Sequence, residues 1–135
     1  MAFANAEELY KVFKLTLDKV VKDEKLNASL GAGDMVVGLK VPNIDAFITL
    51  ELKGSITATY GPPTIKIDVT SANDDETFVK FWQGKLNLMM AMAKGQVKTQ
   101  GAVTKMLKLL PKINPVYKMF AESLKEAGRE DLVIK

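Results

Sequence analysis

The sequence predicts a two-layer α+β domain in which helices cover one face of a sheet. Three observations support this prediction. Residues 5–27 place apolar side chains at helical spacing, residues 34–70 alternate them with a period of two, and helical spacing returns after Ser71. Such changes of period mark where helix gives way to strand and back. The chain has 135 residues, of which 47% are hydrophobic and 26% charged, so residues 1–135 are expected to form one domain.

The N-terminal segment is expected to form a helix that packs on the sheet. Asn5 can cap this helix, and Glu8, three residues later, completes an arrangement of the capping-box kind. An apolar stripe then follows one side of the helix as far as Asn27, through Leu9, Val12, Phe13, Leu15, Leu17, Val20 and Val21.

Four strands are predicted from the alternation, over residues 35–41, 46–52, 56–60 and 65–69. A two-residue link, Lys53-Gly54, joins the second strand to the third, and glycine there can supply the positive φ of a tight hairpin. The sheet is therefore expected to begin as an antiparallel meander.

The rest of the chain is predicted to be helical apart from one short strand. Asn73 or Asp74 caps a short helix whose acidic first turn complements the positive end of the helix dipole. The strand, residues 96–100, follows the fourth strand through a helical crossover, which makes parallel pairing possible. Further helices are expected over residues 85–94, 102–111 and 114–127, the last with Asn114 as its cap.

Charge is distributed unevenly along the chain. Residues 77–121 contain eight lysines, five of the seven methionines and no acidic residue. The net charge of this segment is therefore +8, and that of the remaining residues is −5, which together give the net charge of +3 for the chain. Methionine adapts to varied apolar partners, and lysine is attracted to anionic lipid head groups. The segment suits a domain that holds apolar cargo near an anionic surface. An ordinary helical core with a lysine-rich solvated face is the alternative. The segment has no arginine and no recognisable nucleic-acid-binding motif, so no nucleic-acid partner is expected.

Several functional classes are disfavoured by composition. The chain has no histidine and no cysteine, the residues that most often act as general base, thiol nucleophile or transition-metal ligand. The acids of residues 74–76 can hold a hard cation, but a helix N-terminus explains them more simply. We therefore predict no enzyme, no metal and no cofactor. The N-terminus shows no export signal and no apolar run is long enough to span a membrane, so a cytoplasmic location is expected.

Residues 67–111 carry an ordered series of features that resembles the sterol carrier protein domain family, the type-two non-specific lipid-transfer proteins. The chain resembles a free-standing single-domain member, although its C-terminus, DLVIK, lacks a peroxisomal tail. The features are a strand with an aspartate (67–69), an acid-capped helix with an aromatic residue (75–81), the tetrapeptides GKLN (84–87) and GQVK (95–98), Gly101, and a leucine-rich helix through Leu110.

This resemblance implies a five-stranded, mostly antiparallel sheet covered by helices around an apolar tunnel. It also implies binding and transfer of fatty acids, fatty acyl-CoA, sterols or phospholipids without covalent chemistry, by a monomer or weak dimer that contacts anionic membranes transiently. The residues that the resemblance places against the lipid are Phe78, Phe81, Trp82, Leu86, Leu88, Met89, Met92, Met106, Leu107, Leu110, Tyr117 and Phe120.

Two other functions remain open at this stage. One is a protein-interaction or dimerisation module, which would have a filled core and an exposed apolar patch. The other is an enzyme for a hydrophobic small molecule, with Asp68, Glu51 or Tyr60 as proton carrier. A lipid carrier, in contrast, is expected to contain a dry cavity of roughly 300–1,000 Å³.

Overall fold

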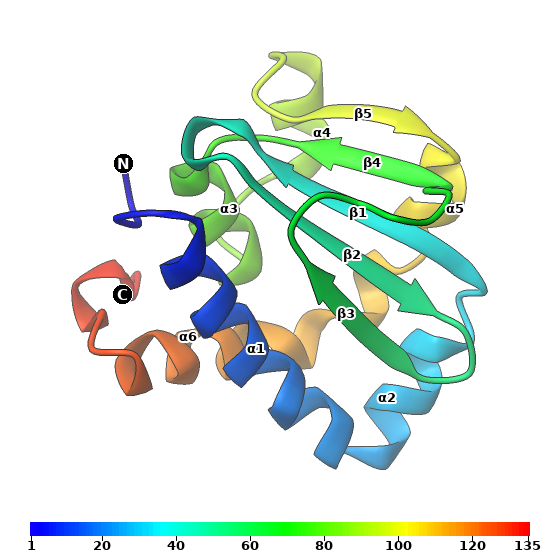
Figure 1. The fold of residues 1–135 in the computed structure, drawn as a ribbon, viewed down its shortest axis with the longest axis horizontal. Coiled ribbons are helices and arrows are strands. Elements are labelled where there is room, and N and C mark those ends of the chain that lie inside the picture. Colours follow the sequence, from blue (N-terminus) through cyan, green and yellow to red (C-terminus); the bar gives the residue numbers. More distant parts are fainter.

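A computed structural model describes residues 1–135 as an α+β fold built on one five-stranded mixed sheet (Figure 1). The strand order is β3-β2-β1-β4-β5, and every neighbouring pair is antiparallel except β1 and β4. The predicted fold class and the mostly antiparallel sheet are therefore confirmed. The strands are β1 (Met35–Val41), β2 (Ala46–Leu52), β3 (Ile56–Tyr60), β4 (Val69–Ala72) and β5 (Lys98–Gly101).

Six α-helices and three short 3₁₀ turns complete the fold. In Figure 1, α1 and α6 lie beside each other below the sheet, and α4 lies beyond the β5 edge, away from α1 and α2. No helix is both long enough and apolar enough to cross a bilayer. The helices are α1 (Ala6–Lys22), α2 (Glu24–Gly31), α3 (Asp75–Trp82), α4 (Leu88–Ala93), α5 (Val103–Leu107) and α6 (Asn114–Glu126).

The predicted first helix is in fact two helices, because the chain breaks at Asp23. The Asp23 side chain accepts a hydrogen bond from the backbone N–H of Leu26 at 3.1 Å and so caps α2. A short acidic side chain competes well for such a capping position, which ends the preceding helix. At the other end, the predicted cap of α1 is confirmed, since Asn5 accepts a hydrogen bond from the N–H of Glu8 at 3.0 Å.

The predicted fourth strand was misplaced. Only its last residue, Val69, belongs to β4, and residues 61–68 instead carry the chain from β3, at one edge, past β2 and β1 to reach β4. Ile67 lies against the outer face of the sheet at Gly38, and Ile65 is exposed. The alternating pattern of this segment therefore reflects a crossover against the outer face of the sheet, and most of the segment is not a strand.

Parallel pairing occurs, but not at the segment for which it was considered possible. Residues 96–100 lead into β5, which is antiparallel to β4, and β4 is the strand that pairs in parallel with β1. The long crossover of residues 61–68 provides the connection that parallel pairing requires. The chain between β4 and β5 contains α3 and α4, and it returns to the sheet in the opposite direction.

Smaller differences concern turns and helix ends. The β2–β3 link has three residues rather than two, although Gly54 adopts the expected positive φ of +85°. Helix α4 starts after Asn87, whose side chain accepts from the N–H of Met90 at 3.1 Å, and the helix expected over 102–111 ends at Leu107. Ile113, not Asn114, occupies the cap position of α6. These differences move the ends of elements by a few residues and leave the order of the elements unchanged.

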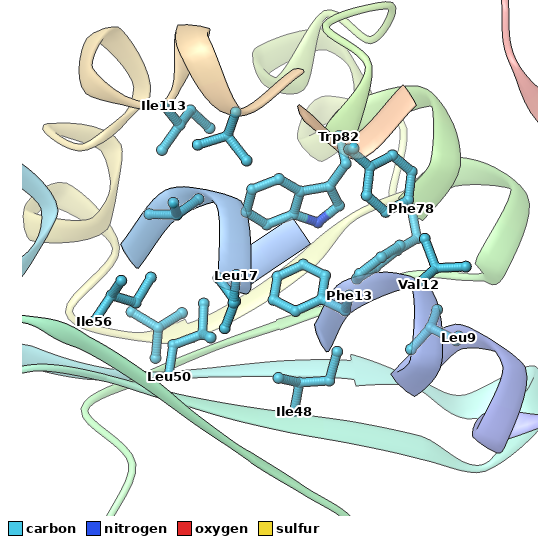
Figure 2. Close-up of a cluster of buried hydrophobic side chains, with 14 of the residues drawn as sticks. Leu9, Val12, Phe13, Leu17, Ile48, Leu50, Ile56, Phe78, Trp82 and Ile113 are labelled. Carbon is cyan, nitrogen blue, oxygen red and sulfur yellow. The ribbon is translucent and has the colours of Figure 1, made fainter. Parts of the chain in front are cut away.

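The core lies between the sheet and the helices (Figure 2). Phe13 of α1 is central to it, with its ring centroid 5.2 Å from that of Trp82 and 5.8 Å from that of Phe78. The Phe13 and Trp82 rings are nearly perpendicular, at 79°, an arrangement that aromatic pairs favour. Ile48 and Leu50 of β2 form the floor beneath these rings. The aromatic cluster thus joins α1, α3 and the sheet.

Helix α2 approaches the β2–β3 turn so closely that only glycine fits at position 31. A Cβ at Gly31 would overlap the backbone of Gly54 and Ser55, and the N–H of Gly54 donates a hydrogen bond to the Gly31 carbonyl at 2.9 Å. We expect Gly31→Ala to lower the free energy of unfolding by about 2–3 kcal/mol, although alanine normally stabilises a helix. Urea denaturation would measure this loss.

Gly54→Ala is the matched control, because a Cβ at Gly54 has no neighbour within 4 Å. Gly54→Ala should lower the free energy of unfolding by about 1 kcal/mol, because only the positive φ at this position disfavours alanine. Equal stability of Gly31→Ala and the wild type would show that the contact between α2 and the turn is loose.

Candidate functional site

An apolar cavity of about 90 Å³ lies between the sheet and the helices. Of the 21 residues that line it, 19 are hydrophobic, and the remaining two are Ser71 and Asn73. No lysine, arginine, aspartate or glutamate lines the cavity. The site is thus suited to an apolar ligand, and its side-chain hydrogen-bond acceptors with oxygen atoms lie only at the end of β4.

The sheet and α1 form one side of this cavity. Alternation along the strands points every second side chain inward, and the pairing of Val37 with Leu50 and Val69 places these residues in one row across three strands. Phe13, Leu17 and Val20 face the sheet from α1, at intervals of four and three residues that keep them on one side of the helix. The strand residues that line the cavity are Val37, Leu39, Leu50, Leu52, Ile56 and Ser71.

The opposite side is built from short elements between α3 and α6. Phe78, Phe81 and Trp82 come from α3, and Leu88 comes from α4. The remaining part of this wall combines α5, the 3₁₀ turn after it and the start of α6. Several of its side chains are only partly buried, so this wall reaches the surface. Its residues are Met106, Leu109, Leu110, Ile113 and Val116.

The cavity is smaller than the size expected of a lipid carrier. Pockets for small molecules typically measure roughly 300–1,000 Å³, and this one measures about 90 Å³. The soft side chains of Met106, Leu109 and Leu110 close over it from the wall of short helices. A long acyl chain therefore needs more space than the cavity provides in this structure.

The residues considered as proton carriers do not line the cavity. Asp68 instead accepts a hydrogen bond from the N–H of Val36 at 2.7 Å. Burial, together with the charge of Asp18, raises the pKa of Tyr60 to about 12, which makes this phenol a poor base at neutral pH. The geometry therefore supports no proton transfer to a molecule in the cavity by these groups.

The acids of residues 74–76 serve separate structural roles. Asp74 caps α3 by accepting from the N–H of Thr77 at 2.8 Å, and Glu76 forms an ion pair with the N-terminal ammonium group of Met1 at 3.4 Å. Asp75 is fully buried and binds the backbone of the N-terminal segment. No group of three or more acidic side chains is placed to hold a metal ion.

Six of the twelve residues predicted to contact a lipid line the cavity: Phe78, Phe81, Trp82, Leu88, Met106 and Leu110. The other six lie elsewhere. Met89 is 60% exposed, Phe120 is fully buried against Phe78, and the Tyr117 ring packs over Gly84. The three that remain are half-buried outside the cavity lining, namely Leu86, Met92 and Leu107. Direct lipid contact by all twelve stays a prediction.

The prediction missed the side of the cavity formed by α1 and the sheet. The signals for these residues were present, because strand alternation and the helical stripe had already assigned most of them to the buried face. Nothing in either pattern distinguishes an inward side chain that fills the core from one that borders a cavity. That distinction depends on how far the opposite wall stands from the sheet.

Comparison with known proteins identifies similar folds and one matching family. The sequence pattern of the SCP-2 sterol transfer family matches residues 12–111. The solution structure of sterol carrier protein domain 2 of Helicoverpa armigera is 27% identical, with a TM-score of 0.60, over 79% of this chain and 85% of that chain. None of the curated proteins matches the chain significantly.

Two further solved structures are similar. Apo sterol carrier protein 2 of Yarrowia lipolytica has a TM-score of 0.57 at 16% identity, over 90% of this chain and 94% of that chain, and so supports the fold. A stereoselective inverting sec-alkylsulfatase from a Pseudomonas species is 27% identical, with a TM-score of 0.54, over 62% of this chain. The matched region is only 13% of that enzyme's length.

Proposed function

The chain belongs to the SCP-2 sterol transfer family, and from this we propose that it binds a long-chain lipid in the cavity and carries it without covalent chemistry. The observation that carries this proposal is the cavity itself, which is bounded by 19 hydrophobic residues and no charged ones. Each methylene group transferred from water into such a site contributes about 0.8 kcal/mol. A long acyl chain can therefore bind with no polar contact along its length.

The small volume of the cavity, about 90 Å³, favours a flexible acyl chain over a rigid ring system. An acyl chain can enter a small space by displacing soft side chains one after another, whereas a fused-ring sterol needs space for its whole ring system. Methionine and leucine side chains on the wall of short helices can change rotamer to admit such a chain. We therefore place fatty acids and fatty acyl groups first among the ligands, with sterols second.

Polar groups near the cavity fit a ligand with a single polar end. Ser71 and Asn73 provide the only side-chain oxygen atoms in the lining, and both belong to the end of β4 or the residue after it. A carboxyl, ester or hydroxyl group at that end can form hydrogen bonds there while the chain extends toward α1. Because smooth apolar walls discriminate weakly between ligands, we expect several chain lengths to be accepted.

The alkylsulfatase relationship does not lead us to propose catalysis. The chain corresponds to 13% of that enzyme, and no titratable side chain lines the cavity here. For its cellular role we propose a cytoplasmic carrier, a monomer or weak dimer, that contacts anionic membranes transiently.

Native mass spectrometry of the freshly purified protein, with organic extraction of its cargo, tests the proposal. We expect a mixed set of fatty acids or phospholipids at close to one per chain. Titration with cis-parinaric acid provides a second readout, because the chain has one tryptophan, Trp82, and it lines the cavity. Bound parinarate should quench Trp82 emission by energy transfer. A lipid-free mass together with unchanged Trp82 emission would contradict the carrier proposal and favour an interaction module.

A further inference from the structure

Helix α4 has an unusual composition for a helix at the surface. Its six residues, Leu88–Ala93, include no polar side chain. Leu88 lines the cavity and Ala91 is buried, but Met89 and Met90 are 60% and 53% exposed and Ala93 is also exposed. A helix that is apolar on every side is normally enclosed by protein or lipid. The outer side of α4 is therefore apolar but is not covered by another part of the protein.

Cationic groups flank this exposed apolar surface. Lys85 precedes α4, Lys94 follows its last residue, and Lys98 lies on the neighbouring edge strand β5. All three are exposed, and none forms an ion pair within the protein. The chain contains no acidic residue between Glu76 and Glu122. Two protruding methionines are thus surrounded by unpaired positive charge.

We propose that α4 and its flanking lysines dock the protein onto an anionic phospholipid bilayer. Apolar side chains can enter the region below the head groups while the lysines contact anionic lipids. A second copy of this chain is a poorer occupant, since it would bring lysines against lysines. The exposed area of Met89, Met90 and Ala93 is also small beside the interface that a stable dimer requires.

The position of α4 links docking to the cavity, and this step rests on the function proposed above. Leu88 faces the cavity while the next residue, Met89, faces outward. The helix is therefore a single layer of protein between the cavity and the proposed bilayer contact. Docking through α4 would place this side of the cavity beside the lipid from which cargo is taken.

Vesicle binding provides the first test, using vesicles of 70% phosphatidylcholine and 30% phosphatidylserine. Each lysine near such a surface contributes a factor of about five to binding, so Lys85→Gln with Lys94→Gln should weaken it about 25-fold. Met89→Gln with Met90→Gln should weaken it about tenfold or more. Binding should also fall with added salt and be weak on pure phosphatidylcholine.

The control removes the same charge from the opposite end of the molecule, where α1 meets α2 (Figure 1). Lys22 and Lys25 are both exposed there, and Lys22→Gln with Lys25→Gln should retain binding within about the factor of five given by one lysine. An equal loss in the control and α4 variants would overturn the proposal, as would unchanged binding by the α4 variants.

A fluorescent label reports the docking face directly. The chain has no cysteine, so Met90→Cys or Val21→Cys introduces one attachment site for an environment-sensitive dye, and both positions are about half exposed. Vesicles should shift the emission of the Met90 label to the blue and leave the Val21 label unchanged. A shift at Val21 alone would assign docking to α1 and refute the proposal.

Fatty-acid uptake in vesicle-free solution separates failure of docking from failure of lipid binding. The Lys85→Gln with Lys94→Gln variant should take up cis-parinaric acid as the wild type does, because neither lysine lines the cavity. Uptake without vesicle binding by the wild type would refute docking and leave the carrier function intact. Vesicle binding without uptake would refute the carrier function alone.

Discussion

Leu39→Trp is expected to weaken fatty-acid binding about 60-fold while the domain stays folded. Leu39 lines the cavity from β1, opposite Ser71 of β4, and is only partly buried. The larger indole would occupy space that the ligand needs. Displacing about three methylene groups from an apolar site costs about 2.4 kcal/mol, at 0.8 kcal/mol for each. Titration with a directly excited fluorescent fatty acid would measure this loss.

The matched control for this substitution is Lys40→Trp. Lys40 is the next residue of the same strand and points to the opposite, exposed face of the sheet, so it tests the effect of a tryptophan on β1 without touching the cavity. Its affinity should match that of the wild type, and both variants should unfold cooperatively on heating. Wild-type affinity in Leu39→Trp would place the ligand elsewhere in the molecule.

Strand alternation predicted the inner face of the sheet correctly, because it depends on local geometry. Side chains two residues apart in a strand share a face of the sheet, so Val37 and Leu39 can be assigned to the same face from the sequence alone. The segment of residues 65–69 shows the limit of this reasoning. Its alternation is real, but Ile67 covers the outer face of β1 at Gly38, and only the strand order reveals that the chain must cross there.

The candidate site was harder to predict for two physical reasons. Helix α4 is apolar throughout, so no periodicity separates the inward Leu88 from the outward Met89. Secondly, a cavity is a distance between two walls, and residues on α1 that border it have the same pattern as core residues. Phe81 and Trp82 do line the cavity, and it was the family resemblance, rather than periodicity, that drew attention to α3.

Asp75 shows the same dependence on non-local structure. The sequence places it in the acidic first turn of α3, where a solvated side chain is the ordinary expectation. In the structure it is completely buried, and its Oδ2 accepts hydrogen bonds from the N–H groups of Ala2 at 2.7 Å and Phe3 at 2.9 Å. Its Oδ1 accepts from the side-chain amide of Asn43 at 2.8 Å. One carboxylate thus joins the N-terminus, the β1–β2 connection and α3.

We expect Asp75→Ala to lower the free energy of unfolding by about 3–5 kcal/mol, because it leaves three hydrogen-bond donors from two segments without their acceptor. Urea denaturation at neutral pH would measure this. Asp74→Ala is the control, since it removes the adjacent, exposed helix cap and should cost about 1 kcal/mol. Similar losses in the two variants would mean that the buried network contributes no more than an ordinary cap.

The stabilisation by Asp75 should also depend on pH in a defined direction. Burial alone would raise the pKa of Asp75, but hydrogen bonds from Phe3, Asn43 and Ala2 and the nearby N-terminal ammonium group lower it below its ordinary value of 3.8. The folded state therefore binds this proton less readily than the unfolded state. The contribution of the charge is complete above about pH 3.9 and is lost as the pH falls through the lowered pKa. The stability gap between the wild type and Asp75→Ala should accordingly narrow in acid, and a gap that widens there would mean that the buried carboxyl is protonated.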